Sequence, residues 1–102
     1  MFTFEDTNYE LKLNIERLKL YEATRGSSAA AEIVQTKGAL PLASIENYFA
    51  VALLNADTGL FVGRKEGVRI ADALMEDVGY AAVLEMIMTA VNRDLGFLLR
   101  RA

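Results

Sequence analysis

The chain of 102 residues contains no histidine and no cysteine, and these absences exclude several kinds of chemistry. Without them the sequence lacks the usual zinc ligands, a thiol nucleophile, a Ser–His pair and the one side chain that titrates near neutral pH. We therefore expect no enzyme activity, no cofactor and no bound metal. The lack of cysteine also fits a reducing compartment, which it does not by itself establish.

Long apolar runs and an excess of positive charge are missing as well. The chain opens with strand-like residues 1–4 instead of a basic and apolar leader, and no apolar run approaches the roughly 18 residues needed to span a bilayer. The sequence therefore predicts a cytoplasmic protein that does not bind membranes. With a net charge of −3, binding to nucleic acid is disfavoured, because non-specific affinity depends on neutralising phosphates.

The most informative pattern in the chain is a change of hydrophobic period. Residues 9–15 alternate between polar and apolar side chains, as in a strand with one buried face, and the spacing becomes helical from Leu18 onwards. Phe2 and Phe4 alternate with polar residues in the same way. The sequence thus predicts an N-terminal β-hairpin over residues 1–15 with its turn at residues 6–8, packed on the helices that follow.

Residues 16–102 show apolar positions at helical spacing and predict four to five helices. Asn14 and Ser28 are suitable N-caps, and Gly79 is a suitable C-cap. The expected helices begin at Asn14 or Ile15, at Ala29, near Pro41, after Gly63 and at Tyr80, and the last runs nearly to Ala102. The chain is therefore predicted to be one α+β domain, a hairpin packed on a mainly helical part.

The same spacing predicts which side chains face the core and which face water. Arg17, Lys19 and Glu22 are expected on the water side of the first helix. The inward positions are expected to be Ile15, Leu18, Tyr21, Leu42, Ile45, Phe49, Ala52, Leu53, Val68, Ile70, Ala71, Leu74, Val78, Val83, Leu84, Ile87, Met88, Val91, Leu95 and Leu98.

Four carboxylates, Asp72, Glu76, Asp77 and Glu85, form the densest acidic group. Paired catalytic acids need one desolvated carboxyl, and a divalent metal needs several oxygen ligands on a shaped loop. The sequence provides neither, so we interpret the group as a solvated helix face.

Residues 59–65 place glycines and basic side chains ahead of a helix, where free amides can bind phosphate. The segment lacks the Gly-Lys-Ser/Thr order of a P-loop, so a linker with Phe61 exposed or tucked under the loop is favoured. The helices on either side could form a helix-turn-helix with Arg64, Lys65 and Arg69 on its second helix. The connection is too long for that motif, and acidic residues lie among the basic ones.

Several apolar residues lie off the main stripes of their helices, where an exposed patch could bind a partner. Met75 and Met88 are expected in the core, whereas Met86 falls nearer the polar edge of the last helix. The candidate partner-binding residues are Leu20, Phe61, Met86, Phe97 and Leu99.

The order of an alternating hairpin, a leucine-rich first helix and three more helices resembles the tail assembly chaperones of long-tailed bacteriophages and the related tail components of gene transfer agents. The similar segments are residues 9–26, residues 42–53 and the spacing from Val68 through Gly79 into the last helix. The resemblance implies a small, non-enzymatic cytoplasmic protein of the bacterial host cell. It would bind the aggregation-prone tape measure protein and help tail tube subunits assemble around it.

The same resemblance implies that a longer form can be made by ribosomal frameshifting, as in some family members. It assigns no functional residue, because the family has no fixed binding motif to match. Two other classes stay open. One is a structural tail or head–tail completion subunit, which would form a ring-shaped homo-oligomer. The other is a small dimeric transcriptional adaptor, which would bind DNA in a salt-dependent way. An enzyme is the least favoured class.

Overall fold

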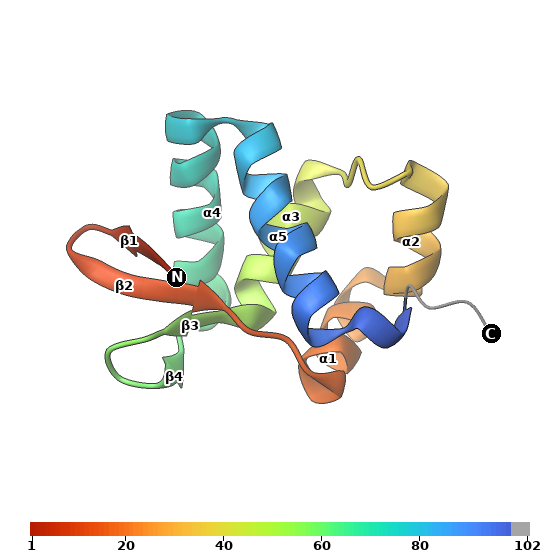
Figure 1. Ribbon diagram of the computed structural model, residues 1–102, viewed down its shortest axis with the longest axis horizontal. Helices are drawn as coiled ribbons and strands as arrows, with labels where there is room; N and C mark the ends of the chain where they lie inside the picture. The colour runs from red at the N-terminus through yellow and green to blue at the C-terminus, as the bar shows by residue number, and fades with distance from the viewer. Residues whose placement is uncertain (99–102) are drawn as a thin grey trace.

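The N-terminal residues form the predicted hairpin, and this hairpin is half of a larger antiparallel sheet. The computed structural model describes residues 1–98. Strands β1 (Phe2–Phe4) and β2 (Thr7–Leu11) form the first hairpin, and β3 (Leu53–Asn55) and β4 (Leu60–Phe61) extend the sheet. The four strands lie in the order β1-β2-β3-β4 (Figure 1).

The turn of the first hairpin lies at Glu5 and Asp6, so the prediction of residues 6–8 is wrong. Both turn residues have positive φ, 49° and 64°, which is the backbone of a two-residue turn whose twist matches that of the strands. Thr7 pairs with Phe4 and already belongs to β2. Strand β2 also ends earlier than predicted, at Leu11, because the chain then turns toward the first helix.

Five α-helices follow the first hairpin within the described residues, which confirms the α+β class with four to five helices. Asn14 caps the first, since its Oδ1 accepts a hydrogen bond from the Arg17 amide at 2.8 Å. Ser28 caps the second through the Ala31 amide at 3.2 Å. The helices are α1 (Ile15–Arg25), α2 (Ala29–Thr36), α3 (Leu42–Ala52), α4 (Arg64–Val78) and α5 (Tyr80–Asp94), followed by a 3₁₀ turn, η1 (Gly96–Leu98).

The sequence does not predict the β3–β4 hairpin, because Leu53 keeps the helical spacing of the preceding residues and residues 59–65 are interpreted as a linker. Asn55 shapes its turn, since Oδ1 accepts hydrogen bonds from the amides of Asp57 at 2.9 Å and Thr58 at 3.1 Å. The register pairs Tyr9 of β2 with Asn55 of β3. The second hairpin therefore provides hydrogen-bond partners for the main-chain groups of β2 that point away from β1.

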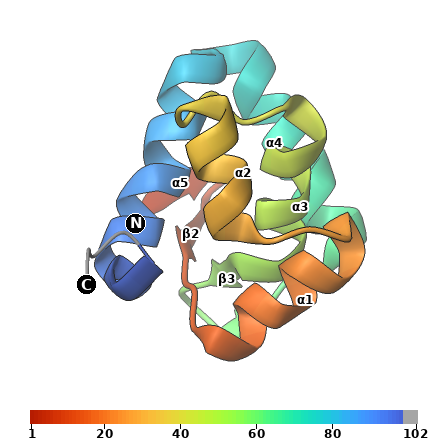
Figure 2. The same cartoon turned by 90° about the vertical axis from the view of Figure 1, so that its right-hand side faces the viewer.

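Helix α3 runs through the middle of the molecule and contacts α1, α4 and α5. Figures 1 and 2 show α2 at the opposite end of the molecule from the β1–β2 hairpin. Most inward predictions are confirmed, and the core contains Tyr9, Leu11, Leu13, Leu18, Tyr21, Ile33, Leu40, Ile45, Tyr48, Phe49, Leu53, Ile70, Leu74, Val83, Ile87, Val91 and Leu95.

Three inward predictions are wrong, and all three fall at the end of a helix. Leu42 begins α3, Val78 ends α4 and Ile15 begins α1, and each of these side chains is more than half exposed. A terminal turn projects beyond the neighbouring helices, so a residue can keep the apolar spacing and still face water.

Two of the side chains predicted to face water are half-buried and also contact the protein. The Arg17 guanidinium covers the Phe61 ring, with Cζ 3.7 Å from the ring centroid, and Glu22 accepts a hydrogen bond from the Ala29 amide at 2.7 Å. Lys19 is exposed as predicted. The long last helix ends at Asp94 instead of continuing nearly to Ala102, and the side chain of Leu98 lies outside the described residues.

Candidate functional site: the groove between the first hairpin and α5

An open groove of about 350 Å³ lies between the first hairpin and α5. Its α5 wall comes from Ala82, Met86 and Ala90, which are spaced four residues apart and so lie on one face of the helix. The hairpin contributes Phe2, Glu10 and Leu11, and the groove is also lined by Met1, Glu85, Thr89 and Arg93. We call this the hairpin groove.

The lining of the hairpin groove is largely apolar and partly adaptable. Met86 packs partly buried against the core, and Met1 is among the most exposed apolar side chains of the described residues. Small alanines lie one turn before and one turn after Met86, and a methionine side chain can adapt its shape through its three rotatable bonds. Such a surface can accept apolar side chains of different shapes.

Hydrogen bonds fix the two walls of the groove against one another. Arg93 of α5 donates to the carbonyl of Leu11 in β2, and the Leu13 amide donates to the Asp94 carboxylate at 2.9 Å. The Arg93 guanidinium holds the pKa of Asp94 below its usual range, against the opposing effect of burial, and the Leu13 amide adds to this lowering. The groove is therefore formed in the free protein.

The predicted partner-binding residues do not all lie together. Of the four that the structure describes, Met86 alone lines the hairpin groove. Leu20 is exposed on α1, Phe97 is exposed in η1, and Phe61 is half-buried beneath Arg17. Leu99 lies outside the described residues.

Two of the three basic residues of the helix-turn-helix interpretation, Arg64 and Arg69, are engaged within the protein, whereas Lys65 is exposed. Arg64 donates to Asn47 Oδ1 at 2.8 Å and to Thr24 Oγ1 at 3.3 Å. Arg69 forms ion pairs with Glu5, at 2.9 Å, and with Glu66. These contacts compete with phosphate for both guanidinium groups. The connection between α3 and α4 is moreover a β-hairpin, unlike the tight turn of that motif.

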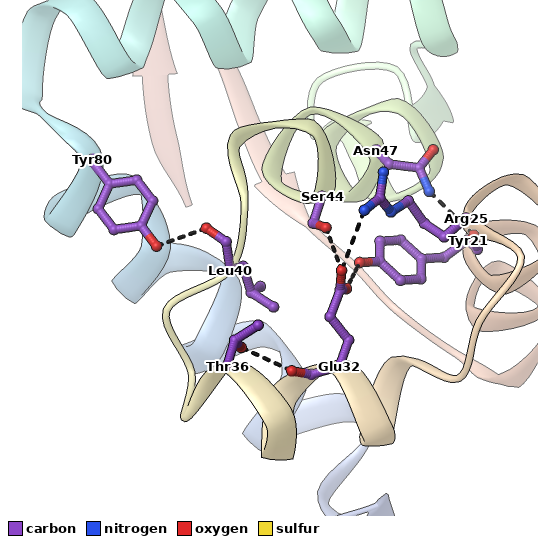
Figure 3. A network of polar contacts seen from close by, with 8 residues as sticks. All are labelled: Tyr21, Arg25, Glu32, Thr36, Leu40, Ser44, Asn47 and Tyr80. Carbon is purple, nitrogen blue, oxygen red and sulfur yellow. Dashed lines mark hydrogen bonds and ion pairs between the residues drawn. The ribbon is translucent and has the colours of Figure 1, made fainter.

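Sequence reasoning missed a second cluster, which is centred on the carboxylate of Glu32 in α2 (Figure 3). This carboxylate accepts hydrogen bonds from the hydroxyl of Tyr21 and from Ser44 Oγ, the latter at 2.6 Å, and forms an ion pair with Arg25 at 3.4 Å. Tyr21 also stacks on Tyr48, with ring centroids 4.0 Å apart. No periodic signal marks Glu32, because its partners come from three other positions in the chain.

The protonation states of this cluster favour a structural role. Burial opposes ionisation of Glu32, but the hydrogen bonds from Ser44 and Tyr21 and the charge of Arg25 outweigh it and lower the pKa of Glu32. Burial and the hydrogen bond to Glu32 raise the pKa of Tyr21, and burial raises the pKa of Tyr48 to about 12. Ser44 is fully buried, so the cluster holds α1, α2 and α3 together and offers no accessible nucleophile.

Two further properties concern residues 1–98. No helix there is long and apolar enough to cross a membrane. That part of the chain also contains no group of three or more acidic side chains arranged to hold a metal ion.

Comparison with known proteins identifies no relative: no protein-family model, no curated protein and no solved structure matches the chain. The resemblance to tail assembly chaperones therefore stays a prediction that depends on the similar sequence segments.

Proposed function

We propose that the protein is a tail assembly chaperone of a phage or prophage. It binds the tape measure protein non-covalently in the cytoplasm of the bacterial host and assists the assembly of tail tube subunits around it. The observation that carries the proposal is the preformed apolar hairpin groove with Met86 at its centre. An apolar groove with methionine in its lining is typical of proteins that bind amphipathic helices of varied sequence.

The size of the groove supports transient binding. Its volume of about 350 Å³ lies at the low end of the range of ligand pockets, so it accommodates a few apolar side chains of a helix at a time. A chaperone must release the tape measure protein when tube subunits replace it, and a small contact favours the moderate affinity that this requires.

The direct test is co-expression with the longest helical protein encoded beside this chain, followed by light scattering behind a sizing column. We expect a soluble joint complex, and we expect the partner to be insoluble when it is expressed alone. A partner that stays soluble alone and elutes separately would contradict the proposal.

Substitutions in the groove test whether it is the binding surface. We expect Met86→Ser to weaken partner binding about tenfold, because truncating a buried apolar contact removes roughly 1–2 kcal/mol. Ala82→Glu is expected to weaken it at least as much, because it adds a third carboxylate to Glu10 and Glu85 and leaves Met86 in place. Isothermal titration calorimetry measures both effects.

The matched control is Val34→Ser, which removes an apolar side chain that is 73% exposed on α2, away from the groove. Its affinity should equal that of the wild type, and thermal melting of all three variants should show a folded protein. Unchanged binding by both groove variants would contradict the assignment of the site.

A second candidate, a structural ring subunit, is favoured by the free edge of the sheet. β1 is an edge strand, and because Phe4 and Thr7 close a two-residue turn, Thr3 directs its amide and carbonyl away from β2. Another copy could extend the sheet at this edge. A closed homo-oligomer of fixed mass, with no association with the co-expressed protein, would support this candidate instead.

A further inference from the structure

A second groove lies where the start of α3 meets α4 and α5. Its lining has two carboxylates and, within the described residues, no basic side chain, whereas in the hairpin groove Arg93 lies beside Glu10 and Glu85. The second groove has a volume of about 400 Å³ and is lined by Leu42, Met75 and Tyr80 together with Asp72 and Glu76. Figure 1 shows the α4–α5 junction and the start of α3 at the end of the molecule away from β4. We call this the acidic groove, defined by these five residues.

The apolar part of the acidic groove is exposed and rigidly held. Leu42 is 58% exposed and Tyr80 is 36% exposed. The Tyr80 hydroxyl donates to the carbonyl of Leu40 at 2.7 Å, which fixes the ring at the surface (Figure 3). A tyrosine ring held in this way offers contact area at a low entropic cost, as in many protein-binding surfaces.

The acidic part of the groove is not neutralised within the described residues. Asp72 and Glu76 are four residues apart on one face of α4, and neither takes part in a salt bridge there. Glu46 of α3 lies against Asp72, and the hydrogen bond between the two carboxyls, together with burial and charge repulsion, raises the pKa of Glu46. Arg69, one turn before Asp72, is held by Glu5 and Glu66.

We propose that the acidic groove binds a basic amphipathic helical segment of a partner protein. The apolar side chains of such a helix would pack on Leu42, Met75 and Tyr80, and its lysine or arginine side chains would pair with Asp72 and Glu76. Charge complementarity selects this occupant, because an acidic helix would bring like charges together whereas a basic one relieves the repulsion already present. The inference does not depend on the proposed chaperone function, since it concerns another groove and a partner of defined charge.

Two synthetic peptides of about 18 residues, or five helical turns, provide the probe. Both carry leucine at the same amphipathic positions, and the polar positions are lysine in one and glutamate in the other. Titration into ¹⁵N-labelled protein should shift the amide resonances of Leu42, Asp72, Glu76 and Tyr80 with the lysine peptide only. The affinity should fall as salt is added, because the carboxylates are exposed to solvent.

Charge-matched variants separate recognition by the groove from general attraction to an acidic protein. The double variant Asp72→Asn/Glu76→Gln should weaken lysine-peptide binding roughly three- to tenfold, as expected for the loss of two solvent-exposed ion pairs. The control Asp6→Asn/Glu16→Gln removes the same charge from exposed positions on the hairpin turn and α1, and it should bind like the wild type. Leu42→Ser should weaken binding without unfolding the protein, because Leu42 is exposed.

Three results would overturn the proposal. Equal weakening by the two double variants would mean that only net charge matters. Resonance shifts confined to the hairpin groove would place the peptide elsewhere. Self-association of the protein that Leu42→Ser abolishes would make a second copy the occupant of the acidic groove.

Discussion

Replacing Gly67 with alanine is expected to lower the free energy of unfolding by about 3 kcal/mol, because α4 crosses α3 at this glycine without room for a side chain. A Cβ at Gly67 would lie 2.5 Å from the Phe49 carbonyl oxygen, 2.8 Å from its carbonyl carbon and 3.0 Å from Ala50 Cα. These are main-chain atoms of a buried helix, so no side-chain rotation relieves the overlap. The two helices would have to separate, and that would loosen the core between them.

Helix propensity alone predicts the opposite result. Alanine is about 1 kcal/mol more favourable than glycine inside a helix, and Gly67 lies within α4 (Arg64–Val78). The overlap outweighs this gain because it involves several main-chain atoms at once. Urea unfolding followed by circular dichroism measures the net effect.

Gly96→Ala is the matched control for this prediction. An added Cβ at Gly96 would meet no atom of residues 1–98 within 4 Å, and its φ lies outside the left-handed region. We expect a change of less than about 0.5 kcal/mol there. If Gly67→Ala were as stable as the wild type, the close approach of α3 and α4 would be contradicted.

Gly67 also illustrates which features of the fold could be read from the sequence. The caps at Asn14, Ser28 and Gly79 were predicted because each depends on a few neighbouring residues. The crossing at Gly67 depends on two helices whose angle no local pattern encodes. Its one sequence signal is an isolated glycine within a helical pattern. That signal indicates a packing constraint but does not show which helix packs against the glycine.

The second hairpin escaped prediction for a related reason. β3 and β4 span only three and two residues, which is too short for an alternating pattern to be distinguished from the end of a helix. Leu53 is buried and keeps the helical spacing of α3, so the local pattern continued after the helix had ended. Pairing of β3 with β2, a long-range contact, decides the conformation there.

The hairpin groove was only partly predictable. Met86 was identified because it lies off the apolar stripe of α5, and that stripe depends on local spacing alone. Phe2 and Leu11, which form the opposite wall, were assigned only to the apolar face of the hairpin. Whether such a face packs tightly or leaves a groove depends on how the sheet is placed against α5, and no single segment of the sequence determines that placement.

The Glu32 cluster leads to the second prediction with a large expected effect. Replacing Glu32 with alanine is expected to lower the free energy of unfolding by about 3 kcal/mol at pH 7, because it removes the acceptor for two buried hydroxyl groups and the partner of a part-buried guanidinium. Tyr21 and Ser44 are both fully buried, so water cannot replace the lost acceptor without entering the core. Urea unfolding at pH 7 measures this loss.

The same carboxylate should make stability depend on pH in a defined direction. Its pKa is lowered in the folded protein from a reference value of 4.5, so its contribution is fully present above that reference value and is lost as the pH falls through the folded pKa. Glu32→Gln keeps the shape of the side chain but does not titrate. The difference in unfolding free energy between wild type and Glu32→Gln should therefore be largest near pH 6 and shrink toward pH 3.

Other carboxylates with lowered pKa values, including Asp94, titrate in both proteins and cancel in this difference. Glu16→Gln is the control, since Glu16 is an exposed carboxylate in the first turn of α1, and its difference from the wild type should stay small across the same range. A wild-type advantage over Glu32→Gln that is constant between about pH 3 and pH 6 would contradict a lowered pKa at Glu32. A shrinking advantage would mean that ionised Glu32 is what holds α2 on α1 and α3.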